Sequence, residues 1–259
     1  MKVSKIILPI VMLFLAYAQT ANAQTYQHQI SNSADQSIEI VVTQSDLYIE
    51  GYDGNEVVIE NMDYEEPPAR AEGLRSLYSS GEDNTGIGLS VEEENGTLKI
   101  YPANRSGGDF KIKVPNKVRI KVEEVNWGGG DFEIKNHSGE IEFKTNTGDM
   151  LLENITGPVV ASSTSGDIKI IISSLMQQKP SSISLVSGDI DITMPENSKV
   201  DFSLYTVTGD VFTDLQIDVP NKVDNMKRLS GGKIEGSMNG GGVEVSLKSV
   251  SGDIYLRKK

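Results

Sequence analysis

The sequence predicts an all-β protein, built as a single-stranded right-handed β-helix or solenoid with coils of about 18–22 residues. Three observations support this prediction: a turn motif that repeats along most of the chain, alternation of apolar and polar residues after each turn, and a composition rich in glycine with only 6% aromatic residues. Short strands and turns suit this composition better than packed helices do. An antiparallel β-sandwich or meander is the alternative architecture.

The repeated motif is Ser, Thr or Gly followed by glycine, aspartate and an apolar residue. Its copies begin at Gly107, Gly129, Thr147, Ser165, Ser187, Thr208 and Ser251. A period of about 20 residues is typical of stacked supersecondary units, so each copy is expected at the same corner of a coil. Between Gly130 and Gly166, glycines also recur every nine residues, and this shorter spacing fits the meander.

Apolar and polar residues alternate after each copy of the motif, as in Ile190-Asp191-Ile192. A period of two places successive side chains on opposite faces of a strand. Ile168, Ile190 and Ile254 should therefore point into a core. Glycine at the bend can adopt positive φ, and the neighbouring Ser, Thr and Asp can hydrogen-bond turn amides.

Residues 1–23 have the features of a signal peptide. Two lysines precede an apolar run over residues 6–18, and Ala21 and Ala23 are the small residues that signal peptidase reads. We expect cleavage between Ala23 and Gln24, and a protein that resides in the periplasm, at the cell surface or outside the cell. The sequence contains no cysteine for a lipid anchor, and no second apolar stretch is long enough for a membrane span after cleavage.

The mature chain, residues 24–259, is expected to form one solenoid domain. Residues 30–61 carry short strand patterns that suit the first coils or an N-terminal cap. Residues 62–94 interrupt the repeat with a short helix near 68–78 and a glycine-rich loop, and the regular coils occupy 96–257. Insertions on a regular scaffold often carry binding functions. The favoured interpretation is a lid that covers exposed end strands.

Candidate ligand-binding residues lie in this insertion and beside a glycine triplet. They are Arg70, Arg75, Tyr78, Asp83, Asn84 and Trp127. The arginines and the tyrosine suit an anionic ligand or a glycan, although pairing with the acidic scaffold is the favoured interpretation. An exposed tryptophan would stack on a sugar ring, whereas burial in the core is the favoured role.

The chain is acidic, with 37 Asp and Glu against 24 Lys and Arg and a net charge of −13, which argues against binding nucleic acid. Its lack of cysteine excludes disulfides, thiolate zinc sites and cysteine nucleophiles. His28 and His137 are expected to be solvated, and they form no catalytic triad or zinc motif. We therefore expect neither an enzyme nor a cofactor.

The aspartates of the motif should line one edge of the stack. Hard cations favour carboxylate oxygens, so Asp131, Asp149 and Asp167 are weak candidates for a calcium row. The favoured interpretation is that each aspartate caps its own turn in water.

The Ser/Thr-Gly-Asp-Ile/Val units, the Val-Pro-Asn-Lys-Val element at 114–118 and 219–223, and the signal peptide resemble the adhesin domain family of bacterial envelope proteins. The segment 71–89 is similar to the version found in Bacteroidetes-type members. The resemblance implies an exported, non-enzymatic domain with a β-helix-like fold and largely unassigned function. It supplies no catalytic residues.

These observations predict a non-catalytic adhesin-like or cell-envelope binding protein that presents an acidic solenoid surface to an envelope glycan or a surface protein. A structural or assembly partner of an envelope system is the alternative. A carbohydrate-active enzyme is the third possibility, because secreted β-helices can place paired carboxylates on one face.

Overall fold

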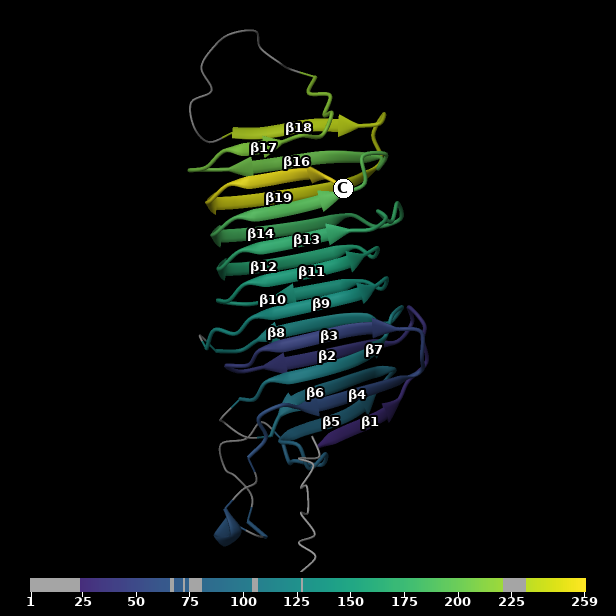
Figure 1. Ribbon diagram of the computed structural model, residues 1–259, viewed down its shortest axis with the longest axis vertical. Coiled ribbons are helices and arrows are strands. Elements are labelled where there is room, and N and C mark those ends of the chain that lie inside the picture. Colours follow the sequence, from purple (N-terminus) through teal and green to yellow (C-terminus); the bar gives the residue numbers. More distant parts are fainter. Residues whose placement is uncertain are drawn as a thin grey trace, which may run out of the picture.

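The computed structural model describes residues 24–65, 68–71, 73–74, 81–103, 107–126, 128–220 and 232–259. These residues form two ten-stranded sheets that face each other in an elongated stack (Figure 1). One short 3₁₀ helix, η1 (Ala69–Ala71), lies at the N-terminal end of the stack. No helix within the described ranges is long and apolar enough to cross a membrane.

The strands follow one another along the stack in an order that differs from the chain order. Sheet A runs β1 (Thr25–Gln29), β4 (Glu56–Asn61), β7 (Phe110–Pro115), β3 (Leu47–Tyr52), β9 (Phe132–His137), β11 (Met150–Ile155), β13 (Ile168–Ile172), β15 (Ile190–Met194), β20 (Ile254–Lys258) and β17 (Val211–Thr213). Sheet B runs β5 (Leu89–Glu94), β6 (Thr97–Pro102), β2 (Ser37–Val42), β8 (Arg119–Glu124), β10 (Ile141–Lys144), β12 (Val159–Ser165), β14 (Ser181–Ser187), β19 (Val243–Ser251), β16 (Val200–Thr206) and β18 (Gly232–Met238).

Each coil contributes one strand to each sheet, and neighbouring coils pair in parallel. Met150 of β11 lies opposite Ile168 of β13, and Ile168 lies opposite Ile190 of β15. The solenoid prediction is confirmed, and the meander alternative is wrong. The nine-residue glycine spacing marks half a coil, because Gly139 and Gly157 lie at the corner opposite Gly130, Gly148 and Gly166.

Close stacking of the coils explains the glycines. A Cβ atom on Gly148 would overlap the carbonyl oxygen of Gly130, and one on Gly166 would overlap that of Gly148. Both glycines also have positive φ, 100° and 109°, a region that side chains with a Cβ rarely adopt. The motif therefore needs glycine for space as well as for backbone conformation.

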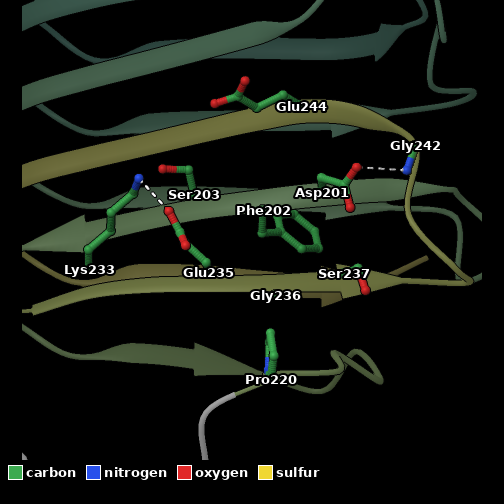
Figure 2. A pocket seen from close by; sticks show the side chains of 10 residues that line it. All are labelled: Asp201, Phe202, Ser203, Pro220, Lys233, Glu235, Gly236, Ser237, Gly242 and Glu244. Carbon is green, nitrogen blue, oxygen red and sulfur yellow. Dashed lines mark hydrogen bonds and ion pairs between the residues drawn. The ribbon is translucent and has the colours of Figure 1, made fainter.

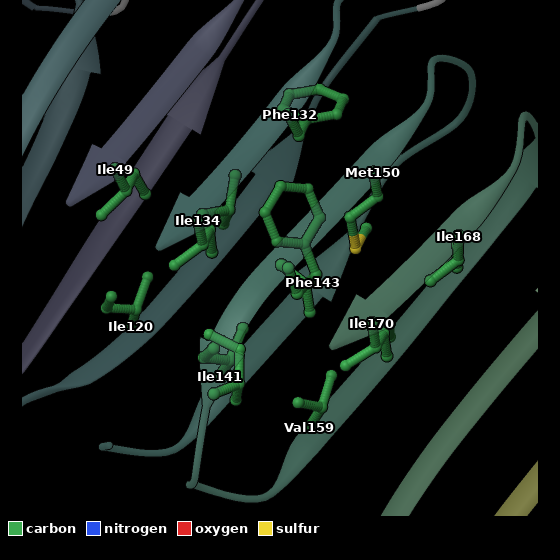
Figure 3. Packing of buried hydrophobic residues seen from close by; sticks show 14 of the residues in the cluster. Ile49, Ile120, Phe132, Ile134, Ile141, Phe143, Met150, Val159, Ile168 and Ile170 are labelled. Atoms are coloured by element: carbon green, nitrogen blue, oxygen red, sulfur yellow. The ribbon is translucent and has the colours of Figure 1, made fainter. Parts of the chain in front are cut away.

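The inward faces of the two sheets form one continuous apolar core. Ile168, Ile190 and Ile254 are at most 1% exposed, as the alternation predicts. Phe132 of sheet A meets Phe143 of sheet B edge to face, with ring centroids 5.0 Å apart (Figure 3). Aromatic pairs favour this geometry over a face-to-face sandwich, and here the pair joins the two sheets.

The coils do not stack in chain order. The coil β2–β3 lies between β6–β7 and β8–β9, and the coil β19–β20 lies between β14–β15 and β16–β17. The first and last coils are thus covered on both sides by other coils. The segments of chain between these coils supply the end strands: β4 and β5 lie between β3 and β6 in the sequence, and β18 lies between β17 and β19 (Figure 1).

Antiparallel strands cover both sheets at the N-terminal end of the stack and sheet B at the C-terminal end, where sheet A ends with the parallel strand β17. At the N-terminal end, β4 and β1 cover β7, and β5 covers β6; at the C-terminal end, β18 covers β16. Ile87, from the glycine-rich part of the 62–94 segment, is buried, and its carbonyl accepts a hydrogen bond from Asn61 Nδ2 at 2.9 Å. Residues 81–94 therefore act as a cover for the core. In the part of the expected 68–78 helix that the structure describes, the helical turn is η1.

Candidate binding surface

A continuous row of aspartates occupies one corner of the stack. In spatial order the row is Asp63, Asp109, Asp46, Asp131, Asp149, Asp167, Asp189, Asp253 and Asp210. In each step, Oδ1 of one aspartate accepts the backbone N–H of the next, at distances between 2.7 and 3.4 Å. These bonds satisfy backbone donors at the corner, where the strand ladder has ended. The aspartates are therefore structural links between coils.

The sequence interpretation that each aspartate caps its own turn is wrong, because the hydrogen bonds run from coil to coil. Asp131, Asp149 and Asp167 lie on three consecutive coils, as the calcium hypothesis requires. Within the described ranges, however, no group of three or more His, Cys, Asp and Glu residues is arranged to hold a metal ion. Calcium binding at these residues stays a prediction.

His137 is not the solvated residue that the sequence indicated, whereas His28 is partly exposed. His137 is 1% exposed, and its Nε2–H donates to the carbonyl oxygen of Val118 at 2.9 Å. Burial lowers the pKa of His137 to about 4, so this side chain is neutral at pH 7. His28 lies in β1 with its Nε2 3.0 Å from Glu93 Oε2 of β5, across the N-terminal end of the stack. Both histidines serve the scaffold.

The residues predicted to bind a ligand in the insertion have different surroundings. Arg70 is exposed in η1. Asp83 accepts hydrogen bonds from the backbone of Thr85, Gly86 and Gly88, and Asn84 exchanges two hydrogen bonds with the backbone of Val91. Asp83 and Asn84 therefore shape the cover loop. Arg75, Tyr78 and Trp127 lie outside the described residues, so their predicted roles stay predictions.

An open groove of about 600 Å³ lies on the outer face of sheet B near its C-terminal end (Figure 2). Strands β16, β18 and β19 form its floor, and Pro220 stands at one side. The outward residues of these strands supply its polar lining because strand periodicity sends their neighbours into the core. The charged members of the lining are Asp201, Lys233, Glu235 and Glu244.

The charges in the groove are partly paired. Lys233 Nζ lies 2.6 Å from Glu235 Oε1, and this hydrogen bond raises the pKa of Lys233 and lowers that of Glu235. Asp201 Oδ2 accepts the N–H of Gly242 at 3.2 Å. Three carboxylates against one ammonium group make the groove acidic. Its short polar side chains suit a hydroxyl-rich or cationic ligand.

Sequence reasoning missed this groove and an exposed aromatic pair, Phe212 and Tyr255, on the opposite sheet. The groove depends on the pairing of β16, β18 and β19, which are distant in the chain, so no local pattern marks it. The aromatic pair had a local signal: Phe212 follows Asp210-Val211, at the outward position where Asp191 and Lys169 stand in other copies.

Comparison with known proteins identifies the family and leaves the activity open. No protein of curated function matches the sequence. A candidate cell adhesion protein from Clostridium sporogenes has a solved structure that aligns with 91% of this chain and 99% of its own, at 11% identity and a TM-score of 0.45. The structure of a candidate adhesin from Bacteroides fragilis aligns with 91% of this chain and 96% of its own, at 12% identity and a TM-score of 0.31. The structure of a candidate lipid-binding protein from Parabacteroides distasonis aligns with 92% of this chain and 98% of its own, at 13% identity and a TM-score of 0.27. Residues 18–257 match the Toastrack DUF4097 family, and the chain belongs to that family.

Proposed function

We propose that this protein is a non-catalytic, adhesin-like binding protein of the cell envelope, which presents the acidic outer surface of its solenoid to a ligand. One observation carries the proposal: the carboxylates that repeat along the chain are engaged in hydrogen bonds between coils, so the repeat builds a stiff scaffold. The groove near the C-terminal end, whose lining comes largely from strands, then offers a place for recognition.

The distribution of chemical groups supports a binding role over catalysis. The only two histidines of the chain lie in the core and at the N-terminal end, far from the groove in the stack. The chain has no cysteine. Carboxylates and Lys233 are thus the remaining candidates for acid and base catalysis in the groove, and Lys233 and Glu235 are bound to each other.

Export to the envelope is the second part of the proposal. Strand β1 begins at Thr25, one residue after the expected cleavage point at Ala23–Gln24, so removal of the signal peptide would leave every described strand intact. Intact-mass measurement of the protein recovered from the periplasmic and extracellular fractions tests this part. A mass that includes residues 1–23 contradicts it.

The binding part is tested with the mature protein on an array of envelope glycans and on intact cells. We expect retention by at least one of these materials and weaker retention of the Glu244→Gln variant. Glu142→Gln is the matched control, because Glu142 also lies exposed on the outer face of sheet B, but its strand β10 is three strands away from β19, which carries Glu244. Equal loss in both variants, or no retention of the wild-type protein, overturns the proposal.

Catalysis is tested separately with a panel of polysaccharides. We expect no turnover. Product formation that disappears in Glu244→Gln or Asp201→Asn would replace the binding role with a carbohydrate-active enzyme.

A further inference from the structure

We propose that the exposed aromatic pair Phe212 and Tyr255 is a stacking platform for a pyranose ring of an uncharged glycan. The inference rests on the proposed binding function and names a ligand class and a second contact surface for it. The platform lies on sheet A at the C-terminal end, on the opposite sheet from the groove.

The position of the pair follows from the coil register. Phe212 lies opposite Tyr255, Tyr255 opposite Asp191, and Asp191 opposite Lys169, all on the outer face of sheet A. A charged residue fills this outward position in the coils of Lys169 and Asp191. Earlier coils place Tyr48 and Leu151 at the same outward position, and the last two coils of the sheet place two aromatic rings beside each other there. An exposed pair of stacked rings is a surface on which an apolar face of a ligand can pack.

The two rings are parallel and partly exposed. Their centroids are 5.4 Å apart with an interplanar angle of 16°, and Phe212 is 48% exposed. Strand β17 is the last strand of sheet A. One face of the Phe212 ring therefore packs on Tyr255, while no strand of the described sheet lies on its other side.

Neighbouring polar groups hold the platform in place. The Tyr255 hydroxyl donates to Asp253 Oδ2 at 3.1 Å, and the Arg257 guanidinium carbon lies 5.2 Å from the Tyr255 ring centroid. Arg257 Nε donates to both carboxylate oxygens of Asp191, at 2.9 and 3.0 Å. Binding on a surface that is already ordered loses less conformational entropy.

The same polar groups provide hydrogen bonds at the edge of the rings. Arg257 contacts Asp191 through Nε, and a guanidinium group carries further N–H donors on its two terminal nitrogens. Asp214 Oδ1 accepts the N–H of Lys258 at 2.8 Å, and a carboxylate can accept more than one hydrogen bond. A sugar ring combines an apolar C–H face, which stacks on an aromatic ring, with hydroxyls that bond to such planar polar groups.

The negative net charge of the protein favours an uncharged ligand over an anionic one. Arg257 is paired with Asp191, and the whole chain carries a net charge of −13. A polyanion such as single-stranded nucleic acid, which also stacks on aromatic rings, would be repelled by this protein. A neutral glycan satisfies both the rings and the hydrogen-bonding groups without a charge penalty.

The test uses the mature full-length protein and immobilised oligomers of N-acetylglucosamine, glucose and mannose. We expect binding of at least one of these, about tenfold weaker for Phe212→Ala and near the wild-type value for Phe212→Tyr, which keeps a stacking ring. Val160→Ala is the control, because Val160 is also exposed, at 43%, but lies on sheet B in the middle of the stack.

The outcomes separate this inference from the proposed function. Binding of a neutral oligomer that is unchanged in Phe212→Ala, or that is lost equally in Val160→Ala, overturns the platform. Retention by intact cells that free neutral oligosaccharides do not compete overturns the glycan and assigns the contact to a surface protein, while the binding function stands. If neither glycans nor cells retain the protein, both the stacking platform and the proposed binding function are overturned. A thermal unfolding midpoint of Phe212→Ala within about 2 °C of wild type shows that lost binding is not lost folding.

Discussion

Asp189 and Asp253 are neighbours in the structure although 64 residues separate them in the chain, and Oδ1 of Asp189 accepts the backbone N–H of Asp253 at 2.7 Å. Asp210, the next motif aspartate after Asp189 in the sequence, donates its own N–H to Asp253 Oδ1 at 2.8 Å. The final coil, β19–β20, therefore lies between the coil β14–β15 and the coil β16–β17, which precedes it in the chain. The row of aspartates follows the order of the coils in space.

This relationship predicts a specific loss of stability in Asp189→Ala. The substitution removes the acceptor of a backbone N–H at a partly buried corner, so we expect the free energy of unfolding in urea to fall by about 1 kcal/mol. Asp189→Asn keeps an acceptor oxygen and should stay near wild type. Asp210→Ala is the control, because Asp210 ends the row and its side chain accepts no N–H from a further coil among the described residues. Equal loss in Asp189→Ala and Asp210→Ala contradicts the structural role.

Gly166→Ala should destabilise the solenoid strongly. The new Cβ atom would overlap the carbonyl oxygen of Gly148 at a residue whose φ is 109°, so steric overlap and backbone strain act together. We expect a loss of about 3 kcal/mol in the free energy of unfolding. Gly232→Ala is the matched substitution, since a Cβ atom there meets nothing within 4 Å. A Gly166→Ala protein as stable as Gly232→Ala would show that the coils do not stack this closely.

The buried histidine predicts a pH dependence of stability. The pKa of His137 is about 4 in the folded protein, against 6.5 for the free side chain, because burial disfavours the charged form. The unfolded chain therefore binds the extra proton between these values. The stabilisation is complete above pH 6.5 and is lost as the pH falls toward 4, a change of about 3 kcal/mol.

The measurement compares urea unfolding of the wild type and of His137→Gln across this pH range. Glutamine retains an N–H donor for the Val118 carbonyl and does not titrate. The stability difference between the two proteins should therefore change between pH 6.5 and 4, in favour of the variant at low pH. Parallel curves for the two proteins would show that His137 is not held neutral by the fold.

Glu124→Gln should destabilise the corner between β8 and β9. The Glu124 side chain is buried, and its carboxylate accepts three backbone N–H groups, from Gly129, Asn146 and Thr147, at 3.2, 2.7 and 3.2 Å. Glutamine replaces one acceptor oxygen with a donor that faces another donor. We expect a loss of about 2 kcal/mol in thermal or urea unfolding.

Glu123→Gln provides the comparison for this prediction. Glu123 is partly exposed and pairs with Lys144 at 3.0 Å, a type of contact that contributes little to stability. A change in Glu123→Gln as large as in Glu124→Gln would mean that loss of a negative charge, and not loss of a buried acceptor, causes the effect.

Local features of the chain predicted the coil itself. The alternation around Ile168, Ile190 and Ile254 predicted which side chains enter the core, and all three are buried. The motif glycines marked the corners correctly. The solvated role expected for His137 was wrong because the side chain at the end of β9 turns inward at the corner, where no alternation pattern applies.

The candidate surfaces were less accessible to sequence reasoning. The groove combines Asp201, Lys233 and Glu244 from three strands that meet only after β18 and β19 have folded back onto β16. The platform combines Phe212 with Tyr255, 43 positions later in the chain. The aspartates predicted to bind calcium and the insertion residues predicted to bind a ligand were chosen because carboxylate and amide side chains can contact many kinds of ligand. In the structure, Asp83, Asn84 and the row of aspartates bond to the backbone.

The chain by itself determined the unit of this fold, because glycine at a crowded corner and a period of two along each strand are local requirements that any coil must meet. Only the tertiary structure decided the order of the units. Every coil presents a similar apolar face, so the repeat is compatible with several stacking orders. The arrangement found here places the first and last coils of the chain between others, and antiparallel strands shield three of the four sheet edges.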